Sequence, residues 1–141
     1  FLPMFHPLLV LAFLAAPGPV AGTAVLVPLL SGALTGMPPF WPPIAPLMSA
    51  ELGVTCGAIA LVRRRWPRAN EWAVLVPSLA LGRAVWIGLV YAFGRVVDLP
   101  AAFLAGISFL AGWPGMILAI SVVPLAVRAI GSVHATAEAE E

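Results

Sequence analysis

Most of the chain consists of long, uniformly apolar stretches separated by short polar or proline-rich links. A helix needs about 20 such residues to cross the hydrocarbon core of a bilayer. The stretches do not alternate between apolar and polar positions, as the strands of a membrane β-barrel do. We therefore expect an all-α membrane protein with a bundle of about five transmembrane helices. The predicted helices cover residues 1–16, 20–35, 44–62, 71–97 and 101–130.

Proline and glycine mark the breaks between these stretches. Pro-Gly-Pro at residues 17–19 separates the first two helices, and four prolines make residues 36–43 a stiff loop. Gly-Trp-Pro-Gly at residues 112–115 divides the last stretch, which is either one kinked helix or a short outer helix followed by a span. Residues 1–131 thus form a single transmembrane domain, and residues 132–141 form a flexible acidic tail.

The composition agrees with a membrane domain and excludes several other classes of protein. Hydrophobic residues make up 62% of the 141 positions and charged residues 9%, whereas about a quarter of a soluble domain is charged. The formal net charge of +1 gives no support to nucleic-acid binding. Without a lysine there is no P-loop or Schiff-base chemistry, and the single cysteine, Cys56, excludes an internal disulfide. We expect no cofactor, no metal and no enzymatic activity.

The arginines indicate how the helices are oriented. Residues 63–68 contain four of them, and Arg128 lies at the end of the last predicted helix. The positive-inside rule places both, and the C-terminus, on the cytoplasmic side of the membrane. The loop at residues 36–43 and the turn at 95–100 are then outside. Phe1 is also outside, so we expect one further helix upstream and six spans in the complete protein.

Glu51 and Arg83 are the two charges that fall deep inside predicted spans. Each lies twelve residues from the arginine-rich end of its helix, or about 18 Å, so the two reach one depth on antiparallel neighbours. A lone charge there costs several kcal/mol and needs a partner or water. The two residues form either a structural ion pair or the polar part of an outward-facing cavity. The two interpretations are compatible, because a polar group of a ligand can insert between the two paired side chains.

Aromatic residues gather toward the outer ends of the predicted spans. Phe40 and Trp41 lie between proline pairs, where they form either an interfacial belt or the lid of a pocket for a ring-containing ligand. Trp113 lies in a helix break, which membrane proteins tolerate only where protein or a cavity covers it. Trp86 and Tyr91, on the fourth predicted helix, lie toward the same level. His6 either packs between helices or hydrogen-bonds a ligand.

Several short motifs resemble, in order along the chain, those of the substrate-binding S components of energy-coupling factor (ECF) transporters. The similar motifs include Phe-Leu-Pro-Met, Pro-Leu-Leu-Ser, Thr-Gly-Met-Pro-Pro, Pro-Leu-Met-x-x-Glu-Leu, Gly-Arg and Gly-Trp-Pro-Gly-Met-Ile. These motifs begin at residues 1, 28, 35, 46, 82 and 112. Each motif alone is weakly specific, but together they cover nearly the whole chain.

This resemblance implies a six-helix protein of the bacterial plasma membrane that captures a vitamin or similar micronutrient from outside. It also implies partners, namely a transmembrane coupling subunit and two ATPase subunits that supply the energy. Thr55-Cys56 stands where the family often has a tyrosine, and Ala119 where it often has a glutamine, so the expected pocket is less polar. The expected substrate-binding residues are Glu51, Arg83, Trp41, Phe40, Trp86, Trp113, Met48 and His6.

Other classes of membrane protein fit part of the pattern. A stand-alone secondary transporter, or an ion or proton channel, would use Glu51 and Arg83 as a relay and would need no ATPase partners. A structural subunit would use the same pair only as scaffold. An intramembrane enzyme is disfavoured, because no nucleophile has a plausible base partner.

Overall fold

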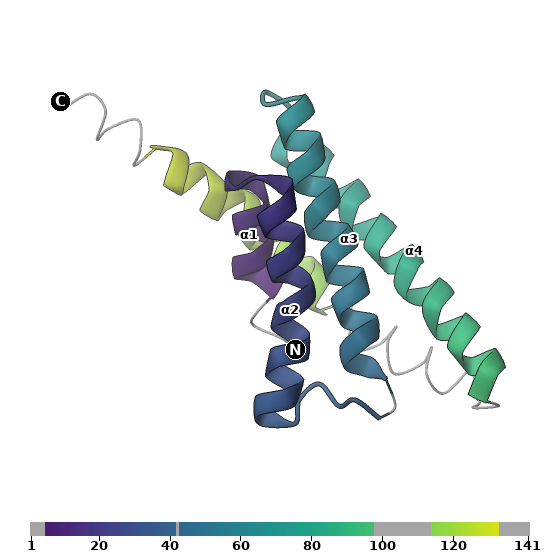
Figure 1. Cartoon of the computed structure of the whole chain (residues 1–141). Helices are drawn as coiled ribbons and strands as arrows, with labels where there is room; N and C mark the ends of the chain where they lie inside the picture. The colour runs from purple at the N-terminus through teal and green to yellow at the C-terminus, as the bar shows by residue number, and fades with distance from the viewer. Residues whose placement is uncertain (1–4, 42, 98–113, 133–141) are drawn as a thin grey trace.

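The computed structural model describes residues 5–41, 43–97 and 114–132, and the regular elements within those residues are all α-helices (Figure 1). Four of them are long and apolar enough to cross a membrane, and α1, with 10 residues, is shorter. The expectation of an all-α membrane bundle with about five helices is confirmed. The elements are α1 (Phe5–Leu14), α2 (Pro17–Thr35), α3 (Ile44–Arg65), α4 (Glu71–Val97) and a C-terminal helix (Pro114–Ser132).

The helix boundaries differ from the predicted ones mainly at the start of α2. Pro-Gly-Pro at residues 17–19 forms the first turn of α2 and is not a break, since proline fits the first helical position, where no backbone donor is needed. The interruption lies at residues 15–16. Gly36 ends α2 with a positive φ of 73°, and its N–H donates to the Gly32 carbonyl at 3.0 Å. Residues 98–113 and the tail at 133–141 lie outside the described residues.

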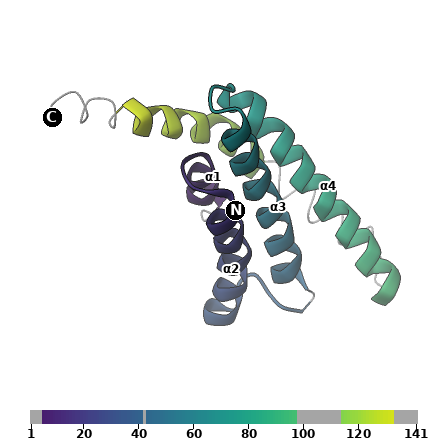
Figure 2. The same cartoon turned by 45° about the horizontal axis from the view of Figure 1, so that its top comes forward.

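Helix α3 lies between α2 and α4 in both views of the molecule and also contacts α1 (Figure 1, Figure 2). Half of the apolar membrane-spanning stretch of α3 is buried inside the protein, whereas the buried share of the corresponding stretch of α2 is 22%. Leu52, Cys56 and Ile59 are fully buried in the core. A helix with neighbours on several sides can also keep polar groups away from lipid, and Glu51 and Thr55 are both buried on α3.

A glycine allows α2 and α3 to pack closely. A Cβ atom added at Gly53 on α3 would lie 2.6 Å from the Val25 Cγ2 atom on α2, so the contact has no room for a side chain. Small residues serve this purpose in membranes, where close van der Waals packing holds helices together.

Charged residues tie four helices together at one end of the bundle. The Glu71 carboxylate at the start of α4 lies 3.8 Å from the Arg63 guanidinium of α3 and 3.2 Å from that of Arg128 in the C-terminal helix. The Arg63 guanidinium also lies 5.7 Å from the centre of the Phe13 ring on α1. We call this group the Glu71 junction. Arg63 and Arg128 therefore share one end of the bundle, as their positions in the sequence predicted, and α4 diverges from α2 away from it (Figure 1, Figure 2).

Candidate functional site

Glu51 and Arg83 form an ion pair between α3 and α4, within the membrane-spanning part of both helices. The Arg83 Nη1 and Glu51 Oε1 atoms are 3.5 Å apart. The Glu51 side chain is 10% exposed and that of Arg83 24% exposed, so the pair is largely shielded. The structure thus brings together the two intramembrane charges that the sequence placed at one depth.

Close contact between α3 and α4 brings the pair together. A Cβ atom added at Gly82 would collide with the Thr55 hydroxyl and lie 3.3 Å from the Glu51 carbonyl oxygen. The Thr55 hydroxyl itself is directed along α3, where it donates to that carbonyl at 2.8 Å. Because Gly82 has no side chain, the helices approach here, and Arg83, the next residue, reaches the Glu51 carboxylate.

The pairing of these two charges is incomplete. Neither the Glu51 carboxylate nor the Arg83 guanidinium makes a hydrogen bond to any residue that the structure describes. A guanidinium carries five N–H donors, and a carboxylate has about four lone-pair sites. In an apolar environment unused hydrogen-bonding groups on a charge are costly, and a buried salt bridge is favourable only where additional hydrogen bonds satisfy them. The pair therefore has capacity for a further polar group.

Apolar side chains lie one helical turn farther from the Glu71 junction. Met48 precedes Glu51 by three residues and Trp86 follows Arg83 by three, so on antiparallel helices both lie on the same side of the ion pair. They form a buried cluster with Val90, against which Phe5 of α1 also packs. This cluster places two of the expected substrate contacts beside the ion pair.

Two buried nitrogen atoms, one of them in this cluster, have no hydrogen-bond partner among the described residues. They are Trp86 Nε1 and His6 Nε2. Trp86 is 7% exposed, and His6 directly follows Phe5, which packs on the cluster. Buried polar groups are normally paired, so an unpaired one points to strain, bound water or a ligand.

The two aromatic residues of the loop between α2 and α3 lie farther along the bundle. The Phe40 ring packs against Gly32 of α2, and both Phe40 and Trp41 are exposed. Trp41 makes an edge-to-face contact with Phe93 of α4, with ring centres 6.3 Å apart. Phe93 follows Arg83 by ten residues, or about 15 Å. Phe40 and Trp41 thus lie at the end of the bundle opposite the Glu71 junction, and Trp113 falls outside the described residues.

Sequence reasoning missed the parts of the site that depend on backbone contact. Thr55 was interpreted as an ordinary helix-packing residue and as a departure from a family tyrosine, but not as part of the site, yet its hydroxyl lies against Gly82 beside the ion pair. The spacing of four residues between Glu51 and Thr55, which places them on one helix face, was the available signal. Phe5 carried no signal beyond its apolar character.

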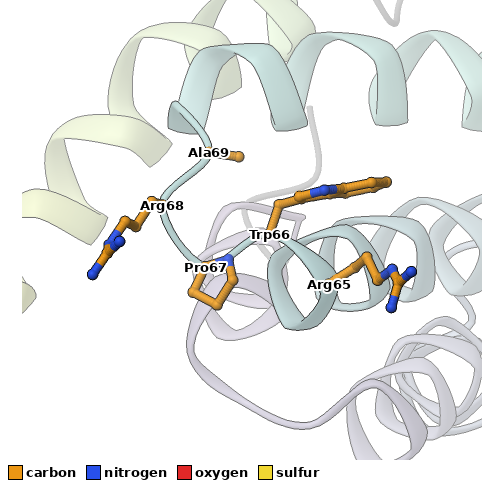
Figure 3. Close-up of a pocket in the computed structure, with 5 residues that line it drawn as sticks. All are labelled: Arg65, Trp66, Pro67, Arg68 and Ala69. Atoms are coloured by element: carbon orange, nitrogen blue, oxygen red, sulfur yellow. The ribbon is translucent and has the colours of Figure 1, made fainter.

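Two hollows of the surface lie away from the ion pair. One, of about 590 Å³, is an open apolar groove between α2 and α3 around Val25 and Gly53. The other, of about 600 Å³, lies in the link between α3 and α4 and is lined by Arg65 to Ala69 (Figure 3). Among the described residues, no three His, Cys, Asp or Glu side chains are grouped so that they could hold a metal ion.

Comparison with known proteins found no matching protein-family model, no similar curated protein and no similar solved structure. The resemblance to ECF S components stays a prediction from the sequence motifs.

Proposed function

We propose that this protein is the membrane-embedded, substrate-binding subunit of an ECF-type importer, which captures a vitamin-like micronutrient for uptake driven by partner ATPase subunits. The ordered sequence motifs support this assignment, and the multi-helix membrane bundle is compatible with it. In the proposed setting the protein lies in a bacterial plasma membrane. The Glu71 junction and residues 63–68 face the cytoplasm, and Phe40 and Trp41 face outward.

The observation that carries the proposal is the incomplete pairing of Glu51 and Arg83 inside the bundle. A purely structural ion pair would be expected to use more of its hydrogen-bonding capacity, because each unused donor or acceptor destabilises the fold. A polar ligand group inserted between the two side chains would complete both. Few but buried polar contacts of this kind provide most of the discrimination between ligands in an apolar pocket.

The neighbouring side chains suggest the chemistry of the ligand. Trp86 and Met48 offer an aromatic and a polarizable surface to a ring. The free indole N–H of Trp86 would donate to a ligand acceptor. A carboxylate and a guanidinium together fit a zwitterion or a polar amide. The best-supported ligand is therefore a small ring compound with such a group, entering from the side of Phe40 and Trp41.

Mass spectrometry of the purified full-length protein is the primary test. We expect a small ring-containing molecule to co-purify and to be lost from the Glu51→Gln variant. Arg95→Gln is a matched control, because Arg95 lies near the far end of α4 and contacts only Tyr91 among the described residues. This control should keep the molecule.

Two results would contradict the proposal. One is a full-length protein that retains no small molecule and is stabilised by none of the water-soluble vitamins in a thermal-unfolding assay. The other is substrate flux into liposomes that hold this subunit alone, which would identify a stand-alone transporter or channel that uses Glu51 and Arg83 as a relay.

A further inference from the structure

The link between α3 and α4 has a defined shape that is maintained by its own hydrogen bonds. The Trp66 N–H donates to the Val62 carbonyl at 2.8 Å, and the Ala69 N–H donates to the Trp66 carbonyl at 3.0 Å. Arg63 closes the link by donating to the Ala69 carbonyl at 2.7 Å. The Asn70 side chain accepts from the Trp72 N–H at 3.0 Å and caps the start of α4. These bonds hold the loop as a preformed surface.

The last turn of α3 and the link that follows it hold four arginines, and only one of them contacts other parts of the protein that the structure describes. Arg63 is engaged by Glu71, Phe13 and the Ala69 carbonyl. The other three are exposed and contact no partner among the described residues. They are Arg64, Arg65 and Arg68. The two carboxylates that the structure describes, Glu51 and Glu71, already have arginine partners. Three positive charges at this end of the bundle therefore have no carboxylate partner within the part of the chain that the structure describes.

An indole lies among these charges. Trp66 is 60% exposed and lines the hollow of about 600 Å³ together with Arg65, Pro67 and Arg68. In Figure 3 the side chains of Arg65 and Arg68 extend on opposite sides of Pro67, away from the loop backbone. An exposed tryptophan is costly in water but favourable at the level of lipid headgroups, where its apolar ring and its N–H both find partners.

We propose that residues 64–68, at the end of α3 and the start of the link, form a binding surface for the headgroups of anionic phospholipids. Its place between the end of one membrane-spanning helix and the start of the next puts it at headgroup depth. Arginine suits the ligand because its planar guanidinium donates two parallel hydrogen bonds to a phosphate. Trp66 would contact the glycerol region beside that phosphate. The proposal does not depend on the transported substrate, because the loop lies about 18 Å from the Glu51–Arg83 pair along either helix.

Native mass spectrometry of the full-length protein in neutral detergent tests this surface. Phosphatidylglycerol and phosphatidylcholine are titrated in parallel, and we expect phosphatidylglycerol to bind roughly 25-fold more tightly. The double variant Arg65→Gln/Arg68→Gln should bind phosphatidylglycerol about 25-fold more weakly, at about fivefold per arginine, and lose the preference. Arg95→Gln, a single exposed arginine near the other end of α4, should change binding less than twofold.

A second measurement reports on Trp66 directly. Brominated phosphatidylglycerol should quench the fluorescence of the wild type more strongly than that of the Trp66→Phe variant, because bromine quenches only nearby indoles. Equal binding of the two lipids to the wild type would overturn the proposal, as would an unchanged preference in the double variant. Displacement of the lipid by an equal concentration of glycerol 1-phosphate would also overturn it, since the ligand would then be a small phosphate.

Discussion

Gly82 on α4 lies directly against the hydroxyl of Thr55 on α3, and this contact sets the separation of the two helices beside the Glu51–Arg83 pair. Replacing Gly82 with alanine should push the helices apart and destabilise the protein by about 1–3 kcal/mol, the usual range for overpacking. Thermal unfolding in detergent measures this effect.

Gly88 is the matched control for that substitution, because a Cβ atom at Gly88 on the same helix would meet nothing within 4 Å. Gly88→Ala should leave the unfolding temperature unchanged or raise it, since alanine is the better helix former. If Gly82→Ala were equally harmless, α3 and α4 would not be in close contact at this point. Adding Thr55→Ala to Gly82→Ala should restore part of the lost stability.

Removing one member of the ion pair should be worse than removing both. Glu51→Gln alone leaves Arg83 without its counter-charge, and Arg83→Gln alone leaves Glu51 without its counter-charge. We expect each single change to cost about 1–3 kcal/mol, less than for a fully buried pair because Arg83 is partly exposed. The double variant should recover part of that stability, as a double-mutant cycle would show. The double variant should nevertheless fail to bind the ligand. If it retained binding, the role of Glu51 and Arg83 would be purely structural.

The indole nitrogen of Trp86 offers a test that separates binding from stability. Trp86→Phe keeps an aromatic ring but removes an N–H that has no partner among the described residues. Losing an unpaired buried donor should not in itself destabilise the protein, so we expect only the modest loss of stability that the smaller ring causes in the buried cluster. Affinity for the co-purifying molecule should fall about tenfold, the value of one lost hydrogen bond. Unchanged affinity would remove Trp86 Nε1 from the proposed site.

The Glu71 junction should contribute modestly, because its arginines are partly or largely exposed. Glu71→Gln leaves Arg63 and Arg128 without a carboxylate, and we expect it to lower stability by about 1 kcal/mol. Arg64→Gln serves as the control, since Arg64 has no partner among the described residues and its loss should have no measurable effect. A loss well above 2 kcal/mol in Glu71→Gln would mean that the junction acts as a buried network.

The helices and the ion pair could be predicted from the sequence because both depend on distance along the chain. The length of an apolar stretch decides whether it spans the bilayer, and equal distance from the arginine-rich ends placed Glu51 and Arg83 at one depth. The start of α2 was wrong by three residues, because Pro-Gly-Pro was interpreted as a break although proline also suits a first turn.

The side-to-side contacts could not be predicted in the same way. Lipid and helix interior are both apolar, so a membrane helix carries little pattern to show which face meets a neighbour. The contact of Gly82 with Thr55 depends on the rotation of α4 about its own axis. The length of an apolar stretch does not determine that rotation. The partnership of Glu71 with Arg128 joins residues 57 positions apart, and no local pattern reports it.

The helices are joined at the Glu71 junction, and α4 and α2 separate progressively with distance from it. Helices joined at one end act as levers about that end, so a rotation displaces each point in proportion to its distance from the pivot. Along α4, Arg83 is about 18 Å and Phe93 about 33 Å from Glu71. A given rotation of α4 therefore moves the Trp41–Phe93 contact nearly twice as far as it moves the Glu51–Arg83 pair. A rotation that moved the aromatic end by about 2 Å would therefore move the two charges apart by only about 1 Å.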